Sequence, residues 1–260
     1  MVDLRLALLG LVVGLLVGLS GVGGSSLMTP LMILFLGVKP LVAVGTDLAY
    51  SVPTKLLGAY VHRGQGTVDR RVVLYLCLGG LPAAVLGLLA LALLRAYLGL
   101  DRLNVALKHG VGLLLLLVAV AILLTPLRSR RRHQPPEVGI SWTWATKGRA
   151  IVVGALVGFL VSLTSIGSGS ITVPALYILL PRLGLRRLVG SDVAFAALLI
   201  PVATVGHLQM GDVNLLLSLN LLLGSLPGVV IGSKLCARLP DIWLRPALAG
   251  ALLFAGSRLV

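Results

Sequence analysis

Apolar segments follow one another along almost the whole chain, and this feature limits what the chain can fold into. They cover residues 4–19, 27–36, 41–61, 72–94 and 103–124, and then 150–163, 171–180, 188–205, 215–235 and 243–259. Hydrophobic residues make up 58% of the sequence, charged residues only 12%, and the mean hydropathy is +1.06. A soluble domain is about half apolar and about a quarter charged. The sequence therefore predicts an all-α, polytopic membrane protein, and it disfavours a soluble enzyme, a disordered adaptor and a disulfide scaffold.

The two halves of the sequence resemble each other. Residues 18–30 read GLSGVGGSSLMTP, and residues 162–174 read SLTSIGSGSITVP. After a slip of one residue the match continues, with Gly-Thr-Asp at 45–47 and Gly-Ser-Asp at 190–192. An internal repeat of this length indicates two homologous units. The predicted divisions are a first transmembrane repeat at 1–127, a basic linker at 128–147 and a second transmembrane repeat at 148–260.

The second apolar segment of each half is too short to cross a bilayer. A crossing takes about 20 helical residues, whereas 27–36 and 171–180 contain about ten residues each and would cover about 15 Å as helices. We therefore predict that the first two segments of each half form a hairpin that enters, turns on a Gly/Ser-rich tip and returns. Three crossing helices complete each half. Short, glycine-interrupted segments at equivalent places in two halves indicate a transport site.

Basic residues set the predicted orientation. The net charge is +14, and arginine is densest at 128–132, in the linker, which we place in the cytoplasm. Because no aromatic residues are interleaved with this charge, topological bias explains it better than nucleic-acid binding. An odd number of crossings per half then gives an inverted repeat with both termini outside, although Arg95 and Arg102 fall outside and count mildly against it. The first segment follows Arg5 as a signal peptide would, but its mid-chain counterpart leads us to expect that it is retained.

The two hairpin tips are the main candidate for a binding site. Irregular backbone at membrane depth is tolerated only inside protein or beside a watery cavity, glycine lets a ligand approach the main chain, and the start of a helix attracts anions. One helix end contributes about 0.3–2 kcal/mol, which is less than the cost of dehydrating an ion, so we expect both tips to meet near the bilayer centre. The candidate substrate-binding residues are Ser20, Gly21, Gly23, Gly24, Ser25 and Ser26 in the first tip, and Thr164, Ser165, Gly167, Ser168, Gly169 and Ser170 in the second.

Each of these candidates also has a structural interpretation. Small residues let helices pack closely, but their duplication in two short segments favours a ligand site. The tip serines can either cap the following short helix or donate to a ligand oxygen. Lys55 is a further candidate for substrate binding, because charge within a membrane segment is costly. Its side chain could instead extend to the cytoplasmic face, and its counterpart in the second half is Ile200.

Four further polar residues occupy matched positions in the two halves. Asp47 and Asp192 could take up protons or bind a cation, but we favour a structural role, in which they cap or stabilise the start of a helix. His62 and His207 lie near segment ends, where interfacial hydrogen bonding is favoured over proton relay. The four histidines of the chain are scattered without metal-ligand spacing. We therefore expect neither a metal nor a cofactor.

Four glycine-rich motifs recur in a definite order. They are GVGGS at 21–25 with Pro30 after it, VGTDL at 44–48, GAYVHRG at 58–64 and LPAAVLG at 81–87. In these motifs the chain resembles the sulfite exporter TauE/SafE family of membrane permeases. The resemblance implies a permease for small sulfur-containing anions, such as sulfite, sulfonates or thiosulfate, whose glycine-rich tips contact the substrate. Ser25 stands where a third consecutive glycine is usual in that family, and Ser168 interrupts the second tip.

These observations together predict a secondary transporter that is not an enzyme. It would move a small anion, a sulfur oxyanion or organosulfonate, across the cytoplasmic membrane by alternating access. A passive anion channel is the alternative. An intramembrane enzyme with a serine nucleophile and a histidine base is a weaker one, because no motif aligns the two groups. The expected partners are the small anionic substrate and the lipid bilayer, without nucleic acid, and the sequence leaves a homodimer open.

Overall fold

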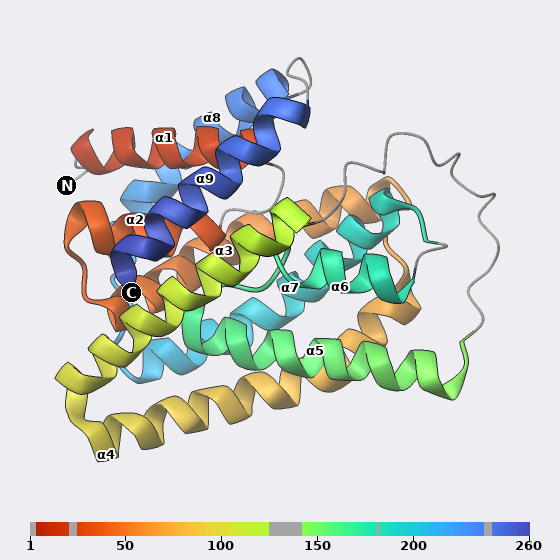
Figure 1. Cartoon of the computed structure of the whole chain (residues 1–260), viewed down its shortest axis with the longest axis horizontal. Helices are drawn as coiled ribbons and strands as arrows, with labels where there is room; N and C mark the ends of the chain where they lie inside the picture. The colour runs from red at the N-terminus through yellow and green to blue at the C-terminus, as the bar shows by residue number, and fades with distance from the viewer. Residues whose placement is uncertain (1–3, 21–24, 125–141, 181–182, 237–240) are drawn as a thin grey trace.

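The computed structural model describes residues 4–20, 25–124, 142–180, 183–236 and 241–260, with side chains except at 5, 16–20, 25, 26, 124, 232–236 and 241–248. In these ranges helices are joined by turns and loops, without a strand, which confirms the predicted all-α class (Figure 1). The helices are α1 (Leu4–Ser20), α2 (Ser25–Leu36), α3 (Pro40–Gly64), α4 (Arg70–Leu124), α5 (Trp144–Thr164), α6 (Thr172–Leu179), α7 (Leu185–Gln209), α8 (Leu215–Cys236) and α9 (Asp241–Leu259).

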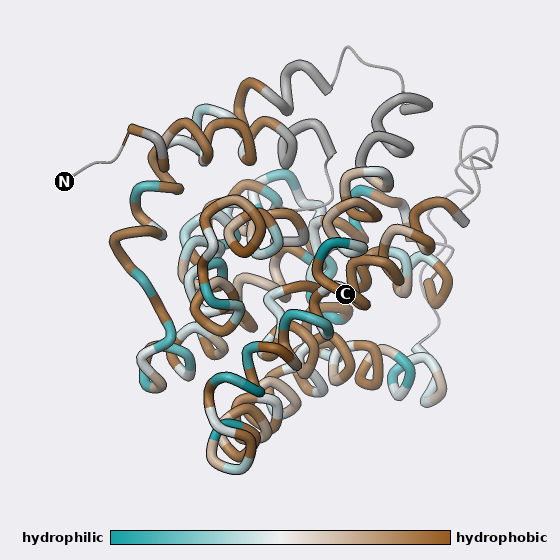
Figure 2. The backbone as a smooth tube through the Cα atoms, turned by 60° about the vertical axis from the view of Figure 1, so that its left-hand side comes forward, coloured by the Kyte–Doolittle hydropathy of each residue, from teal (hydrophilic) through white to brown (hydrophobic). Residues whose placement is uncertain are grey.

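Three helices in the described part of the chain are long and apolar enough to cross a membrane. They are Arg70–Leu123, Trp144–Thr164 and Leu185–Gln209. α3 is as long as α7, with 25 residues, but polar residues such as Asp47 and Lys55 lower the hydropathy of α3. Large apolar side chains are exposed, for example Leu78 on α4 and Leu219 on α8. Figure 2 shows hydrophobic residues along most of the helices. Such an exterior suits lipid tails, and the chain is a membrane protein.

α4 consists of two helical legs that meet at Gly99. Its 55 residues are helical except at this glycine, where φ is 73° and ψ is 168°. Glycine adopts such a positive φ without the steric penalty of a Cβ atom. Figure 1 shows the two legs, gold and yellow-green, diverging from this corner. The break confirms that segments 72–94 and 103–124 are separate helices.

The second segments of the two halves are short, as predicted. α2 has 12 residues and α6 has 8. The segment before α6 differs from the prediction, because α5 is 21 residues long and begins at Trp144, well before the expected 150. Its N-cap, Thr143, accepts a hydrogen bond from the Thr146 amide, which fixes this early start. α5 alone therefore reaches the length of a crossing, and the predicted return of its hairpin to the same side stays a prediction.

Helices of the two sequence halves are paired with each other. α1 packs along α8, and α5 packs along the first leg of α4 (Figure 1). Both pairs approach so closely that a Cβ atom added to a glycine of one helix would collide with the backbone of the other. The equivalent contacts are Gly10 with Leu221 and Gly14 with Ser225 in one pair, and Gly154 with Leu76 and Gly158 with Gly80 in the other.

The second turns of α3 and α7 bind loops of the opposite half in the same way. The Thr46 hydroxyl accepts a hydrogen bond from the Asn214 amide at 3.0 Å. The Ser191 hydroxyl accepts one from the Asp69 amide at 2.9 Å. The side chains of Asp69 and Asn214 in turn accept from amides at the starts of α4 and α8. A helix of the first half thus binds a loop of the second half, and the equivalent helix of the second half binds the equivalent loop of the first.

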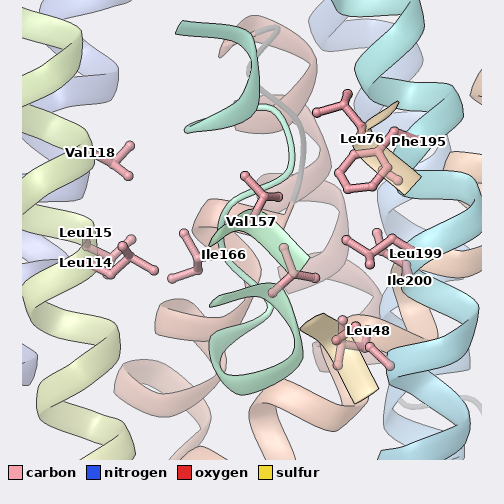
Figure 3. Close-up of a cluster of buried hydrophobic side chains, with 14 of the residues drawn as sticks. Leu48, Leu76, Leu114, Leu115, Val118, Val157, Ile166, Phe195, Leu199 and Ile200 are labelled. Carbon is pink, nitrogen blue, oxygen red and sulfur yellow. The ribbon is translucent and has the colours of Figure 1, made fainter. Parts of the chain in front are cut away.

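A buried apolar cluster holds the loop between α5 and α6. Figure 3 shows Phe195 of α7 beside Leu76 of α4, with Val157 and Ile166 nearby. Ile166 belongs to the loop itself, is fully buried and shares this cluster with Leu115 of the second leg of α4. The loop is therefore anchored in the protein interior by the side chain of Ile166, and Ile171 packs against the same cluster.

Candidate functional site

The second predicted tip is a buried, non-helical loop. α5 ends where Ser165 adopts a left-handed conformation with φ of 61°, and the Ser165 amide donates to the Val161 carbonyl. Gly167 at φ 146° and Gly169 at φ 83° continue the loop in backbone conformations that favour glycine. Ser168 is fully buried. The prediction of irregular backbone enclosed by protein is thus confirmed for this tip.

One face of α3 turns three polar side chains into the protein. Asp47, Ser51 and Lys55 are spaced four residues apart, so they lie on the same side of the helix. All three are buried. Since burial of charged groups without partners is costly, the neighbours of these side chains decide what the site can do.

Asp47 joins α3 to α2 and to the tip. Its Oδ2 atom accepts hydrogen bonds from the Thr29 hydroxyl at 2.7 Å and from the Ser165 hydroxyl at 2.9 Å. Its Oδ1 atom has no partner among the described residues. The predicted capping role is wrong, because the N-cap of α3 is Lys39 and Asp47 lies about two turns further along the helix. Its position there places the carboxyl group inside the bundle.

Lys55 points into the protein and reaches the tip. Its side chain is only 8% exposed, and its Nζ atom donates to the Ser168 Oγ atom at 3.1 Å. The alternative, a side chain extended to the membrane surface, is therefore wrong. The Lys55 charge also attracts the carboxyl groups of Asp47 and Asp192. No carboxylate of the described residues forms an ion pair with it, so its closest defined partner is a neutral hydroxyl.

Asp192 faces the same loop from α7. It is 1% exposed, and the Gly169 amide hydrogen-bonds to its carboxyl group. The nearby Thr172 hydroxyl donates to the Gly167 carbonyl. Its Oδ1 atom has no partner in the described part of the chain. The N-cap of α7 is Gly184, so the capping role predicted for Asp192 is wrong as well. The tip therefore lies between two equivalent carboxyl groups, one from each half.

The tip serines do not cap α6. The N-cap residue of α6 is Ile171, without a capping side chain, and the amides of Ile171 and Thr172 donate to the Gly167 carbonyl. The helix start thus satisfies its first amides within the loop. The Ser170 hydroxyl is buried without a partner among the described residues. Ser168 uses an oxygen lone pair for Lys55 and keeps its hydrogen for donation.

The first tip lies largely outside the described residues. Gly21, Gly23 and Gly24 belong to the part that is not described. Ser20 ends α1 and Ser25 and Ser26 begin α2, but their side chains are also outside the description. Of the second tip, Thr164 closes α5 by donating from its hydroxyl to the Leu160 carbonyl. The meeting of the two tips stays a prediction.

The two histidines have hydrogen-bond partners other than the charged residues of this cluster. His62 is partly exposed near the end of α3, and its Nδ1 atom lies 2.9 Å from the Thr67 hydroxyl. His207 is fully buried, and its Nε2 atom donates to the Ser162 carbonyl at 2.9 Å. The expected interfacial position suits His62 but not His207, because α5 covers the latter. Within the described residues, the hydrogen bonds of the two rings go to Thr67 and Ser162 rather than to Asp47, Lys55 or Asp192.

Arg95 has a defined partner at the turn between α7 and α8. It pairs with the buried carboxylate of Asp212 at 3.1 Å and also donates to the Met210 carbonyl. Burial raises the pKa of Asp212, while the Arg95 guanidinium acts in the opposite direction. The charge of Arg95 thus stabilises a turn, and a role in ion recognition is not needed to explain it.

Two residues of the site were not singled out from the sequence. Ser51 lies one turn from both Asp47 and Lys55, on the same buried face of α3. The four-residue spacing is a signal that could have found it. Thr29 offers no such signal, because its bond to Asp47 depends on how α2 packs. Within the described ranges, no group of three or more His, Cys, Asp or Glu side chains is placed to hold a metal ion.

A buried, charged cluster inside a bundle of apolar helices is typical of membrane transporters. The sequence model described as "Sulfite exporter TauE/SafE" matches residues 6–259. The chain belongs to this family of membrane transporters.

Curated relatives bear names that agree with this class. The chain is 40% identical over 258 residues to the probable membrane transporter protein YjnA of Bacillus subtilis, covering 99% of this chain and 100% of the relative. It is 30% identical over 249 residues to the probable membrane transporter protein YdhB of the same organism, with 92% and 95% covered. A probable membrane transporter protein of Xylella fastidiosa is 29% identical over 234 residues, with 88% and 83% covered. No solved structure gives a significant match.

Proposed function

We propose that this chain is a secondary transporter that carries a small oxyanion, a sulfur oxyanion or organosulfonate, across the cytoplasmic membrane. The family name supports the sulfur anion as the substrate class. It acts as a carrier rather than as an enzyme, in agreement with the names of its relatives.

The observation that carries the proposal is the contact of Lys55 with Ser168. A buried ammonium group whose defined partner is a neutral hydroxyl keeps attraction for an anion. Ser168 supplies a hydroxyl hydrogen beside it, and the Ser170 hydroxyl in the same loop has no partner among the described residues. Oxyanion oxygens accept such hydrogens readily. A small oxyanion at the tip would thus receive one positive charge and neutral donors, which together replace part of its hydration shell.

Alternating access fits the repeated contacts between the halves. When residue i of one unit contacts residue j of the other, and j contacts i in return, the units are related by a twofold axis. The glycine pairs and the Thr46 and Ser191 bonds follow this pattern. We infer an inverted repeat with the basic linker in the cytoplasm and both termini outside. Rocking of the two halves about the tips then opens the site to either side.

Transport of radiolabelled anions in proteoliposomes tests this function. The panel contains sulfite, thiosulfate, sulfate, a small alkyl sulfonate and chloride. Purified protein should take up at least one sulfur anion, and unlabelled substrate trapped inside should accelerate the uptake of labelled substrate outside. Such counterflow requires a carrier with alternating access. Rapid uptake without counterflow supports the channel instead, and a panel without any transported anion contradicts the proposal.

Bulk introduced at the tip tests the site. Gly167→Val should abolish uptake, because this glycine has a positive φ and faces Val161 at 3.1 Å from an added Cβ. Gly250→Val on α9 is the matched control, since nothing lies within 4 Å of the Cβ position there. If Gly167→Val folds and transports like the control, the anion does not bind at this tip.

A further inference from the structure

The cluster around the tip contains two carboxyl groups but one ammonium group. Asp47 and Asp192 are both buried, and Lys55 is the buried cation that attracts both. When all three groups are ionised, the cluster carries one net negative charge. Tyr50 is the other titratable side chain that interacts with Asp47, and it is neutral near pH 7. A cluster of this charge repels the very anion that Lys55 and the serines are placed to attract.

Each carboxyl group keeps one oxygen atom without a partner. Both described partners of Asp47, Thr29 and Ser165, donate to its Oδ2 atom, and its Oδ1 atom is left over. The Oδ1 atom of Asp192 is likewise without a partner among the described residues. An unpartnered buried oxygen is costly for a carboxylate. A proton on that oxygen removes the charge and so removes most of the cost.

The carboxyl groups are duplicated in the two halves, whereas the cation is not. Asp47 and Asp192 follow Gly-Thr and Gly-Ser at equivalent places, and the counterpart of Lys55 is Ile200, which is 1% exposed. The pair of acids is therefore part of the repeated architecture. Equivalent groups on opposite halves are suited to exchange protons with opposite sides of the membrane as the halves rock.

We propose that Asp47 and Asp192 take up protons together with the anion, so that the protein is an anion–proton cotransporter. This inference rests on the proposed function. A proton from the side at which the site is open binds a carboxylate oxygen, the cluster becomes neutral, and the anion then binds at Lys55 and Ser168. After the site opens to the other side, the anion and the proton leave, and the carboxylate is restored.

The test uses the whole protein in proteoliposomes loaded with the pH dye pyranine and supplied with the anion that the panel shows to be carried. In the wild type, anion uptake should be accompanied by proton uptake above that of empty liposomes. An imposed gradient of about one pH unit should drive about tenfold accumulation for one proton per singly charged anion. Asp47→Asn and Asp192→Asn should lose this accumulation and should carry fewer protons per anion than the wild type. Asp101→Asn, an exposed carboxyl group on α4, is the matched control.

An anion that is itself protonated carries a proton in the wild type and in the variants alike. The difference in protons taken up per anion between them therefore reports only on the carboxyl groups of the protein. If the wild type moves the anion without protons, or accumulates it with a sodium gradient at equal pH, the inference is overturned even where a variant fails to fold. Unchanged proton-to-anion ratios in both Asn variants would overturn it too. In each of these cases the anion still moves and the proposed function stands, whereas the absence of any anion movement contradicts the proposed function itself.

Discussion

Lys55 of α3 and Ser168 of the α5–α6 loop are 113 positions apart in the sequence, and their Nζ and Oγ atoms lie 3.1 Å apart. The bond joins a helix of the first half to the tip of the second. It brings a cation to a loop whose glycines allow close approach of a ligand, and this is the core of the transport model.

Removal of the Ser168 hydroxyl should weaken anion binding more than it weakens folding. A hydrogen bond to a charged group is worth about 1.5–3 kcal/mol, so Ser168→Ala should raise the apparent KM for the anion about tenfold or more. The concentration dependence of initial uptake rates measures this effect. Ser257→Ala, which changes an exposed serine on α9, should leave KM unchanged. Equal KM values in the two variants would remove Ser168 from the binding site.

Gly169 offers a test that separates backbone strain from function. Alanine at φ 83° is strained by about 1–2 kcal/mol, and Gly66→Ala carries the same kind of strain at φ 67° in an exposed turn. Both variants should melt at lower temperatures in detergent. Only Gly169→Ala should also slow transport, because its amide binds the Asp192 carboxyl group. Equal loss of transport in both variants would show that strain alone matters.

Close packing of α5 on α4 should make Gly158 intolerant of even a methyl group. Its Cβ position collides with the Gly80 carbonyl, and overpacking costs about 1–3 kcal/mol. Gly158→Ala should therefore lower the melting temperature in detergent. Gly110→Ala, on an exposed part of α4 with open space around it, should leave it unchanged or raise it slightly. A Gly158→Ala protein as stable as Gly110→Ala would contradict this packing.

The reciprocal bonds of Thr46 and Ser191 should contribute equally to stability. Thr46→Val and Ser191→Ala each remove one acceptor for a loop amide, at a cost of about 1–3 kcal/mol. Since the two bonds share no partner, the double variant should lose about the sum of the single losses. Thermal unfolding in detergent measures all three variants. A large loss from one substitution and none from the other would contradict the equivalence of the halves.

The sequence predicted what depends on local pattern. Hydropathy and glycine positions predicted the short second segments, the break between the two legs of α4 and the non-helical second tip, but not the early start of α5. The partners of Asp47 could not be predicted, because the Ser165 hydroxyl reaches it across 118 positions. The position of Asp47 in its helix was predicted wrongly for another reason. The first residue of a helix is harder to locate from sequence than the helix itself, and Asp47 lies about two turns inside α3. Lys55 was ambiguous because only packing decides whether a lysine points inward or outward.

The most direct test of the site is the initial rate of anion uptake by Lys55→Met in proteoliposomes, with Lys55→Arg beside it and the folding of both checked by their melting temperatures. Lys55→Met should lose at least about tenfold in rate, since about 1.4 kcal/mol of lost attraction suffices for that. Lys55→Arg should retain part of the activity because it keeps the charge. A folded Lys55→Met protein that carries the anion at the wild-type rate would contradict the binding of the anion at Lys55.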